Sequence, residues 1–470
     1  MNSNVKVIRK RKSFHSVFKH KLYRMRNIYC LVCLVLSLIA CFLMVKIGIF
    51  PIMYPILIFI VFFILTFIGF IFINVHKKNG LKAVGYVLLS IISVSCIVLL
   101  FYVNTTSKFF DNNFNENSHV YAENTYYVLG KSGIKYTDEM MVGDVGVFYR
   151  TYNLENVLKK VNEKYHFDQV DYTDVSKLFS DFQNDVIPFV VIDKSLYDVF
   201  FSLTEVKESE FSILDTINVY TRKNKTNSLN MNNYNIYLKV LSNDGLNDFN
   251  VIVTMNNKKN KVLFTYVPEN SYLSLYNEHD KLKYINIYGT NTTRSVLEEL
   301  LDIDIDYSLT FNESKLSNFV DYIGGIKYCS DEGFEVDSLS MDSLKINEGC
   351  NKIDGSEALV LSQFEEDRLN HNILIALGII DEVFDLGTLK RFNGTLNTFG
   401  NVIDTDLPHA LVTNIIRSGF NQKKWKTEKQ NIEGVIDRDN VCLSSIEDDV
   451  LVLDSNSVRD ASNKIKETLN

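Results

Sequence analysis

Three long apolar runs dominate the first hundred residues, roughly Ile28–Val45, Ile52–Val75 and Ala83–Val103. Each run has about the 17 to 25 residues that an α-helix needs to cross the hydrocarbon layer of a membrane. The first run could instead be a secretory signal peptide, but its basic leader is long and no small-residue cleavage site followed by a polar mature chain comes after it. The pattern therefore predicts three transmembrane helices within residues 28–103.

Charge divides the chain into a basic head and an acidic body. Residues 1–103 contain 13 Lys and Arg and no Asp or Glu, whereas residues 104–470 contain 36 basic and 57 acidic residues, a net charge of -21. Basic segments stay on the cytoplasmic side of a membrane, and here they lie before Asn27 and between the second and third runs. We therefore expect a cytoplasmic tail at residues 1–27, a multi-pass protein of the plasma membrane and an extracellular body. Nucleic acid is not an expected partner, because its phosphates require clustered Lys and Arg.

The first part of the outer body alternates between strand-like and helix-like patterns. Residues 104–124 are polar and rich in Asn, which predicts a linker. Residues 125–225 then predict a small α/β accessory domain. Its expected strands are Val145–Tyr149, Gln169–Tyr172 and Val186–Ile192, and its expected helices are Asn153–Tyr165, Val175–Asn184 and Ser195–Phe201. The pattern resembles one lobe of a periplasmic solute-binding fold, and the alternative is an accessory packing domain without a ligand.

The second part of the outer body, residues 230–470, predicts a larger α/β domain with a mixed sheet flanked by helices. The expected strands are Ile236–Leu241, Phe249–Met255, Lys261–Val267, Tyr307–Phe311, Ile326–Tyr328 and Asp449–Leu453. The expected helices are Thr293–Leu301, Lys315–Ile323, Gly355–Gln363, Asn372–Phe384, Leu389–Phe399, His409–Ser418 and a terminal helix from about Ser457. The predicted fold is thus three transmembrane helices followed by two extracytoplasmic α/β domains.

Cysteine and histidine do not occur at metal-ligand spacing. Four of the seven cysteines lie in the apolar runs, which leaves Cys329, Cys350 and Cys442 in the outer body. A bridge between Cys329 and Cys350 would close a loop of about 20 residues and contribute roughly 3 kcal/mol in an oxidising compartment. Cys442 could be free or could be the partner of either residue. The eight histidines are scattered, so a zinc site or a Ser-His-Asp arrangement is not expected.

Several stretches of the outer body carry motifs that occur together in one family. They are NDFNVIVTMNNKKNKVLFTYVPEN (Asn247–Asn270), HDKLKYINIYG (His279–Gly289), the run Leu297–Ile326, LKINEGCNKIDGSEALVLSQ (Leu344–Gln363) and EDRLN (Glu366–Asn370). They resemble the LytR-CpsA-Psr proteins, which link cell-wall glycopolymers from a polyprenyl-pyrophosphate carrier to peptidoglycan in mainly Gram-positive bacteria. Residues 126–201 resemble the accessory domain that some members carry. The resemblance implies polyprenyl-linked glycan and peptidoglycan as partners, besides membrane lipid and catalytic paralogues.

The resemblance also implies a set of site residues. Pyrophosphate carries concentrated negative charge, so its site needs Arg or Lys donors and carboxylates that hold a divalent cation. Carried over by position, Asp248 and Asn270 would be metal ligands for Mg²⁺ or Mn²⁺, and Lys281 would bind phosphate. Arg368 would bind phosphate and act in catalysis, and Asp367 would be the catalytic carboxylate near the acceptor or metal. The apolar runs Phe249–Met255 and Ile373–Ile380 would line a pocket for the polyprenyl tail.

Several arginines of the family pattern are absent. They align with Leu246, Glu269, Gln363, Glu365 and Asn370, and the charged positions that remain have a net charge of -2. Hydrogen bonds to charged groups contribute about 1.5 to 3 kcal/mol each, so losing two arginines could weaken pyrophosphate binding roughly 10²- to 10⁴-fold. Two functions stay open: a glycopolymer phosphotransferase, or a degenerate paralogue that binds glycan or a partner and regulates wall assembly. A transcriptional regulator is not expected, because only about 26 residues precede the first run.

Overall fold

The computed structural model describes residues 14–470 except for short stretches. These are 76–77, 115–120, 150, 152–153, 174, 195, 198–206, 223–230, 276–277, 289–290, 338–342, 384–390, 421–424 and 442–445. The chain divides into two compact units. The first, which we call the helical unit, consists of residues 1–110 and 412–423, and the second, the outer unit, consists of residues 111–411 and 424–470.

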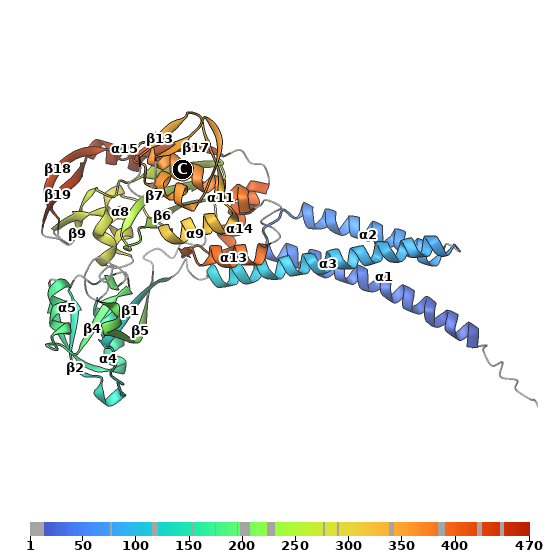
Figure 1. Ribbon diagram of the computed structural model, residues 1–470, viewed down its shortest axis with the longest axis horizontal. Helices are drawn as coiled ribbons and strands as arrows, with labels where there is room; N and C mark the ends of the chain where they lie inside the picture. Colours follow the sequence, from blue (N-terminus) through green and yellow to red (C-terminus); the bar gives the residue numbers. More distant parts are fainter. Residues whose placement is uncertain are drawn as a thin grey trace, which may run out of the picture. The chain divides into compact units, whose positions relative to one another are not determined.

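Three long helices make up most of the helical unit (Figure 1). They are α1 (Phe14–Ile47), α2 (Met53–Asn74) and α3 (Asn79–Asn113). All three are long enough and apolar enough to cross a membrane, which confirms the expected membrane anchoring. Gly69 and Gly85 let α2 and α3 approach closely, since a Cβ on Gly85 would lie 3.0 Å from the carbonyl oxygen of Gly69.

Helix α3 continues beyond the third apolar run. The run was expected to end at Val103 and to be followed by a linker, but the helix extends to Asn113. Val103 and Phe110 are seven residues apart, which places them on one side of the helix, and both are buried. The apolar side chains at helical spacing therefore outweigh the Asn content on which the linker was inferred.

The smaller sheet of the outer unit belongs to the segment expected as the accessory domain. Its strands are β1 (Tyr121–Lys131), β2 (Val142–Phe148), β3 (His166–Tyr172), β4 (Phe189–Asp193) and β5 (Phe211–Arg222), in the order β3-β2-β4-β1-β5. Its helices are α4 (Leu154–Lys164) and α5 (Val175–Gln183), with short 3₁₀ turns at Asp138–Met140 and Glu208–Glu210. Strand β2 runs parallel to β3 and β4, whereas β1 runs antiparallel to β4 and β5.

The two helices cover opposite faces of this smaller sheet. Helix α4 packs against Phe189 and Val191, and α5 packs against Val190 and Ile192. Strand β4 is apolar at successive positions because it is buried on both faces. The three predicted strands and first two predicted helices are confirmed. Strands β1 and β5 were not predicted, and most of the helix expected at Ser195–Phe201 lies outside the described residues.

The larger sheet has six strands in the order β16-β11-β6-β7-β8-β17. They are β6 (Asn233–Leu241), β7 (Asn247–Asn256), β8 (Lys261–Tyr266), β11 (Tyr307–Asn312), β16 (Ile403–Thr405) and β17 (Lys426–Asn431). Strand β7 runs antiparallel to both neighbours, and β11 runs parallel to β6. The sheet is therefore mixed, as expected.

Four two-stranded ladders accompany this sheet. They pair β9 (Tyr272–Leu275) with β10 (Glu278–Lys281), β12 (Ile326–Ser330) with β15 (Gly349–Ile353), β13 (Phe334–Val336) with β14 (Leu344–Ile346), and β18 (Gly434–Val441) with β19 (Ile446–Leu453). Cys329 and Cys350 lie directly opposite each other on β12 and β15 and form a disulfide. Cys442, the other candidate for a bridge, lies outside the described residues.

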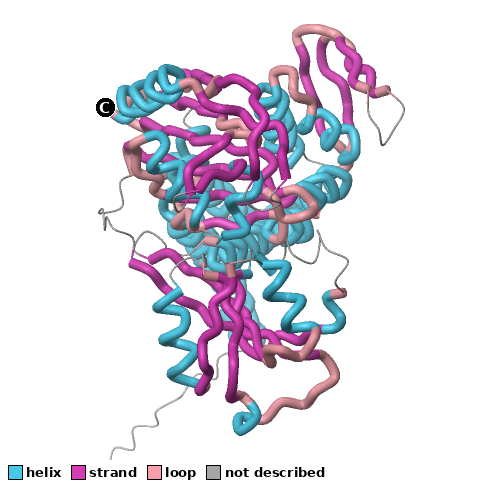
Figure 2. Tube along the Cα trace, turned by 90° about the vertical axis from the view of Figure 1, so that its left-hand side faces the viewer, coloured by secondary structure: helices cyan, strands magenta, loops and turns pink. Residues whose placement is uncertain are grey.

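Helices cover both faces of the larger sheet (Figure 2). The helices of the outer unit are α7 (Leu282–Ile285) with a 3₁₀ turn at Asn286–Tyr288, α8 (Thr292–Leu301), α9 (Glu313–Ile323), α10 (Gly355–Gln363), α11 (Arg368–Val383), α13 (Phe392–Gly400) and α15 (Ser455–Leu469). Helix α14 (His409–Phe420) begins in the outer unit, and from residue 412 it belongs to the helical unit. On one face, Tyr237, Ile252 and Leu263 pack with α7, α8 and α15. On the other face, Val240 and Phe249 lie against α9, α10 and α11. The predicted fold class is confirmed.

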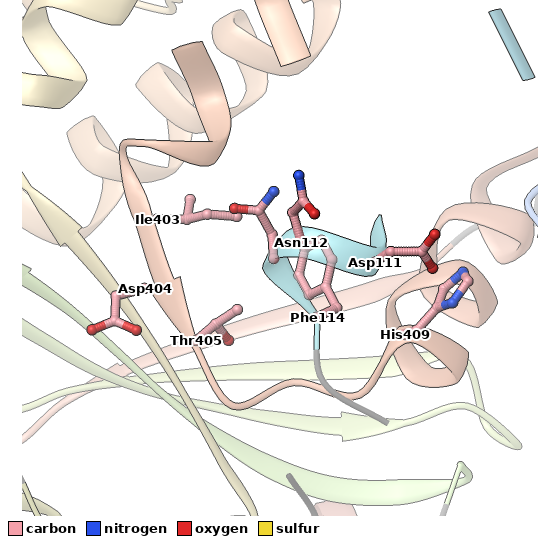
Figure 3. Close-up of a pocket in the computed structure, with 8 residues that line it drawn as sticks. Asp111, Asn112, Phe114, Ile403, Asp404, Thr405 and His409 are labelled. Atoms are coloured by element: carbon pink, nitrogen blue, oxygen red, sulfur yellow. The ribbon is translucent and has the colours of Figure 1, made fainter. Parts of the chain in front are cut away.

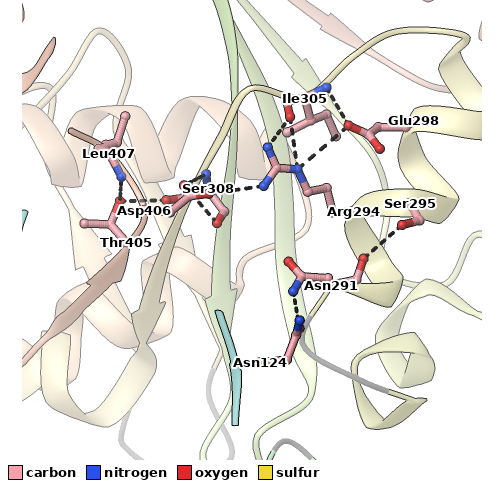
Figure 4. A network of polar contacts seen from close by, with 10 residues as sticks. All are labelled: Asn124, Asn291, Arg294, Ser295, Glu298, Ile305, Ser308, Thr405, Asp406 and Leu407. Atoms are coloured by element: carbon pink, nitrogen blue, oxygen red, sulfur yellow. Dashed lines mark hydrogen bonds and ion pairs between the residues drawn. The ribbon is translucent and has the colours of Figure 1, made fainter. Parts of the chain in front are cut away.

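A buried arginine fastens the edge of this sheet to α8 (Figure 4). Arg294 Nε donates to the carbonyl oxygen of Ile305 at 3.0 Å, and its Nη1 donates to Asp406 Oδ2 at 3.2 Å. The other carboxylate oxygen of Asp406 accepts the backbone N–H of Ser308 at 2.5 Å. Because Asp406 directly follows β16, this network holds the short edge strand in register with β11.

Candidate functional site

One buried arginine lies between two carboxylates where strands β7 and β8 of the larger sheet begin and end. Arg368 Nη1 donates to Glu269 Oε1 at 2.9 Å, and Nη2 donates to Asp248 Oδ2. The third nitrogen, Nε, donates to the carbonyl oxygen of Ser362 at 3.0 Å. The arginine side chain is only 6% exposed, and Asp248 and Glu269 are 19% and 12% exposed. We call Asp248, Glu269 and Arg368 the triad.

Strand order explains why these residues meet. Strands β7 and β8 are antiparallel neighbours, so the first residues of β7 and the last residues of β8 lie side by side at one end of the strands. Asp248 is the second residue of β7, and Glu269 follows β8 in a turn after Pro268. Arg368 begins α11, directly after Asp367, whose φ of 54° gives the chain the sharp turn that starts the helix.

Neighbouring aromatic rings complete the surroundings of the triad. The guanidinium carbon of Arg368 lies 5.8 Å from the centre of the Phe249 ring, within the range of a cation–π contact. Tyr266 Oη donates to the second carboxylate oxygen of Glu269 at 2.9 Å. Burial acts to lower the pKa of Arg368, but the charges of Asp248 and Glu269 outweigh it and raise the pKa above its usual value. Arg368 therefore stays charged.

A narrow, mainly apolar cavity of about 30 Å³ lies beside the triad. Asp248 takes part in both, because its side chain lines the cavity and binds Arg368. The cavity is also lined by Phe249 and Ile375, one from each of the two apolar runs expected to form a pocket for a lipid tail. Its other lining residues come mostly from the helices over this face of the sheet: Val240, Glu313, Leu316, Ser317, Val320, Ala358, Leu359, Ser362 and Asn372.

The other candidate residues, Lys281, Asn270 and Asp367, lie outside the triad. Lys281 is 5% exposed at the end of β10, and the backbone N–H of Lys283 donates to the carbonyl oxygen of Glu269 at 2.8 Å, which places this segment against the Glu269 turn. Asn270 is exposed, and its carbonyl oxygen accepts the N–H of Leu451 at 2.9 Å. Asp367 is exposed, and its carbonyl oxygen accepts hydrogen bonds from the backbone N–H groups of Asn370 and His371 in the first turn of α11.

Comparison with known proteins identifies the family. A model described as the LytR_cpsA_psr family matches residues 212–467, more than half of the chain. The chain belongs to this family. Among curated relatives, the polyisoprenyl-teichoic acid–peptidoglycan teichoic acid transferase TagT of Bacillus subtilis is 24% identical over 170 residues, which are 34% of this chain and 53% of TagT. The transferase TagU of Bacillus licheniformis is 23% identical over 236 residues, which are 48% of this chain and 73% of TagU. The chain spans about half the length of TagT.

Solved structures of LytR-CpsA-Psr proteins give a weaker likeness. The crystal structure of Bacillus subtilis TagU has a TM-score of 0.40 and 18% identity, and covers 51% of this chain and 97% of that chain. TagT bound to LIIa-WTA has a TM-score of 0.41 and 19% identity, and covers 52% of this chain and 94% of that chain. Family membership therefore rests on the match to the family model.

Glu269 is a member of the triad that the sequence did not predict. It aligns with an arginine of the LytR-CpsA-Psr pattern, so the sequence marks it only as a lost positive charge. A carboxylate at this position still fits the site, because Arg368 comes from another element and bonds to it. The negative charge of Glu269 could have revealed its role, because a buried acidic residue needs a basic partner.

The other positions that align with lost arginines make separate contacts. Leu246 is 4% exposed and belongs to the core. Gln363 Nε2 donates to Glu313 Oε1, and Asn370 Oδ1 accepts a hydrogen bond from Lys429 Nζ. These three positions therefore contribute to packing and hydrogen bonds within the outer unit.

The triad as it stands does not fit a divalent cation. In the part of the chain that the structure describes, no group of three or more His, Cys, Asp or Glu side chains is close enough to hold a metal ion. Asp248 and Glu269 each give one carboxylate oxygen to Arg368. The guanidinium thus occupies the place between the two carboxylates in which a cation would bind.

Replacing Glu313 with Gln is expected to change how stability depends on pH. Burial, and then the charge of Asp248, raise the pKa of Glu313 above its ordinary value of 4.5. The stability that its neutral form contributes is complete below pH 4.5 and is lost as the pH rises through the raised pKa. Glu313→Gln should match the wild type in acid and be more stable at neutral pH, which unfolding midpoints between about pH 4 and pH 8 measure.

Glu299→Gln is the matched control for this prediction, because Glu299 is exposed on α8. It should follow the wild-type pH profile. A Glu313→Gln profile parallel to that of the wild type across the whole range would contradict the prediction.

Proposed function

We propose that this chain is an extracytoplasmic, membrane-anchored protein that acts in the transfer of glycopolymers from polyprenyl-pyrophosphate carriers to peptidoglycan. Membership in the LytR-CpsA-Psr family supports the proposal, as do the relatives TagT and TagU, whose names describe teichoic acid transfer to peptidoglycan. The three long apolar helices supply the membrane anchor. A lipid-linked substrate would then be delivered in the plane of the same membrane.

One observation carries the proposal: Asp248 belongs both to the triad and to the apolar cavity. A polyprenyl pyrophosphate has a charged head joined to an apolar tail, so its site needs a charged group at the mouth of an apolar space. Arg368 supplies a permanent positive charge for the head, and Phe249 and Ile375 supply apolar surface for the tail. Because the cavity is narrow, α9, α10 and α11 would have to move apart before a tail could enter.

A role for Mg²⁺ or Mn²⁺ is part of the proposal. Asp248 would help to hold such a cation, which would supply positive charge for the pyrophosphate oxygens. Asn270 directly follows Glu269, and Asp367 directly precedes Arg368. Both residues are exposed and could contribute further oxygen ligands.

In the second candidate function, this chain is a catalytically degenerate paralogue that regulates wall assembly. The observation that favours it is that all three nitrogen atoms of Arg368 already donate hydrogen bonds within the protein. Binding to phosphate would require at least one of these bonds to break. In this case the outer unit would bind a wall glycan or a catalytic paralogue without transferring polymer.

A thermal-shift experiment tests the proposed function. The full chain in lipid nanodiscs would be heated with a short-chain polyprenyl pyrophosphate, with and without Mg²⁺ or Mn²⁺. Ligand binding stabilises the folded state by RT ln(1 + [L]/Kd), about 2.7 kcal/mol at a hundredfold excess over Kd. We expect a metal-dependent rise of the midpoint that Arg368→Met abolishes and that Arg438→Met, an exposed position on β18, leaves intact. No rise in the wild type would favour the paralogue.

The orientation of the membrane segment is also proposed. Residues 1–26 contain nine Lys and Arg, and three more lysines (Lys77, Lys78 and Lys82) lie between the second and third apolar runs, so both segments should face the cytoplasm. Three crossings then place the outer unit outside the cell. A phosphatase reporter that requires export, fused after Asn104, should be active, and an inactive but stable fusion would reverse this orientation.

A further inference from the structure

A second cavity in the outer unit lies apart from the triad (Figure 3). Its volume is about 560 Å³, within the range of about 300 to 1,000 Å³ that is typical of small-molecule sites. The lining residues come from three places in the sequence: residues 111–114 at the end of α3, Ile403–Thr405 on β16, and His409 at the start of α14. No lining residue is shared with the triad or with the cavity beside it.

The cavity rests on parts of the fold that are fixed by other contacts. Thr405 Oγ1 donates to the carbonyl oxygen of Ser308 at 2.6 Å, which holds β16 against β11 (Figure 4). The side chain of Asn113 packs against Gly400, where an added Cβ would lie 2.9 Å from the Asn113 amide. Phe114 is 7% exposed and belongs to the core. The walls are therefore formed before any ligand arrives, which lowers the cost of binding.

The lining side chains exclude several classes of ligand. None of the eight is Lys or Arg, so a phosphate or another anion finds no permanent positive charge there. The wall is mostly polar, with Ile403 and the buried Phe114 as its apolar members, which does not suit a lipid tail. Among the residues that the structure describes, no cluster suited to a metal ion occurs, so a metal ion does not explain the cavity either.

The polar groups that remain match the hydroxyl groups of a sugar. Asp111 and His409 point toward each other at one end of the cavity, and Asp404 lies at the other end (Figure 3). Asn112 lies between them, and Asn113 also lines the cavity. Each of these two residues carries an amide with two N–H donors and one acceptor oxygen. Each hydroxyl of a sugar is both a donor and an acceptor, so it needs carboxylates and amides side by side.

We propose that this cavity binds a neutral saccharide. The carboxylates of Asp111 and Asp404 accept hydrogen bonds from sugar hydroxyls, and the amides of Asn112 and Asn113 donate to sugar oxygens. Asp111, Asn112 and Asp404 are exposed, so a saccharide reaches them without unfolding of the walls. The site does not depend on the triad, and its saccharide is bound without a chemical step.

Titration of the full chain in nanodiscs with chitotetraose, a neutral oligosaccharide, tests the proposal. Nanodiscs avoid detergents with sugar headgroups, which would compete for the cavity. We expect saturable binding, at least tenfold weaker with Asp404→Ala or Asn112→Ala and lost with Asn112→Trp, whose side chain fills the cavity. Asp331→Ala, an exposed carboxylate on the turn after β12, is the control and should bind as the wild type does.

Three outcomes would overturn the proposal. The first is no saturable binding of chitotetraose by the wild type up to about 10 mM. The second is wild-type affinity in a folded Asn112→Trp variant. The third is tight binding of spermidine that Asp404→Asn abolishes while chitotetraose does not bind, because the cavity would then be a site for organic cations. Unchanged unfolding midpoints of the ligand-free variants show that any loss of affinity is local.

The saccharide could reach the cavity as a free glycan strand or as the headgroup of a glycolipid. The two sources share the same sugar chemistry, and the titration separates them. Nanodiscs that contain a diglucosyl diacylglycerol should block chitotetraose if the headgroup reaches the cavity, and should leave it unaffected if only soluble glycan does. Either result keeps the cavity as a saccharide site, because Asn112→Trp must abolish whichever binding is seen.

Discussion

Replacing Arg368 with Met is expected to destabilise the outer unit by about 3 to 5 kcal/mol, the usual cost of breaking a buried ion pair by removing one partner. The loss is large because Asp248 and Glu269 would be left beside each other without a counter-ion, in a place where each is less than one-fifth exposed. Met keeps most of the apolar volume of the arginine stem, so lost charge rather than lost packing causes the effect. Denaturant unfolding measures it through Trp425, the one tryptophan of the chain, which adjoins β17 of the outer unit.

A rescue experiment separates this cause from a general loss of structure. Adding Asp248→Asn and Glu269→Gln to Arg368→Met removes the two uncompensated charges. The triple variant should recover most of the lost stability, because it leaves no uncompensated buried charge. Arg438→Met should change stability by less than about 0.5 kcal/mol, since Arg438 is exposed on β18. A single Arg368→Met variant as stable as the wild type would show that the triad has no counter-ion role.

The triad also shows which part of the site the sequence could predict. Asp248 and Arg368 were found by their positions in motifs, and the structure brings them together. Glu269 was missed because motif comparison scores a residue against its family counterpart and does not see its partner in space. The contact between Glu269 and Arg368 spans 99 residues of sequence, a separation at which local patterns carry no information about pairing. Asn270 was chosen instead, and it is exposed beside Glu269.

Helices and strands were predictable from the sequence where one face, or both faces, of the element are buried, because burial gives a clear pattern of apolar residues. The buried strand β4 and the amphipathic helices α4 and α9 have strong patterns and were predicted. Strand β17 has the sequence KTEKQN, with no apolar residue, and was missed. It exists because its backbone pairs in parallel with β8 at the edge of the sheet, which requires no apolar side chain. The polar cavity was missed for a similar reason, because its walls come from segments almost 300 residues apart.

Removing the disulfide with Cys329→Ser and Cys350→Ser is expected to cost the outer unit about 3 kcal/mol, since the bridge closes a loop with a sequence separation of 21. Both cysteines are exposed, so serine adds no buried polar group, and the loss comes from the freedom that the unfolded chain regains. Denaturant unfolding through Trp425 measures the change. Wild type treated with a reductant should match the double variant, and Cys442→Ser alone should match untreated wild type. Equal stability of all four samples would contradict a structural bridge, whereas a loss with Cys442→Ser would assign the bond to Cys442. A bridge retained in protein isolated from cells under alkylating conditions would also support an outer unit that faces an oxidising compartment.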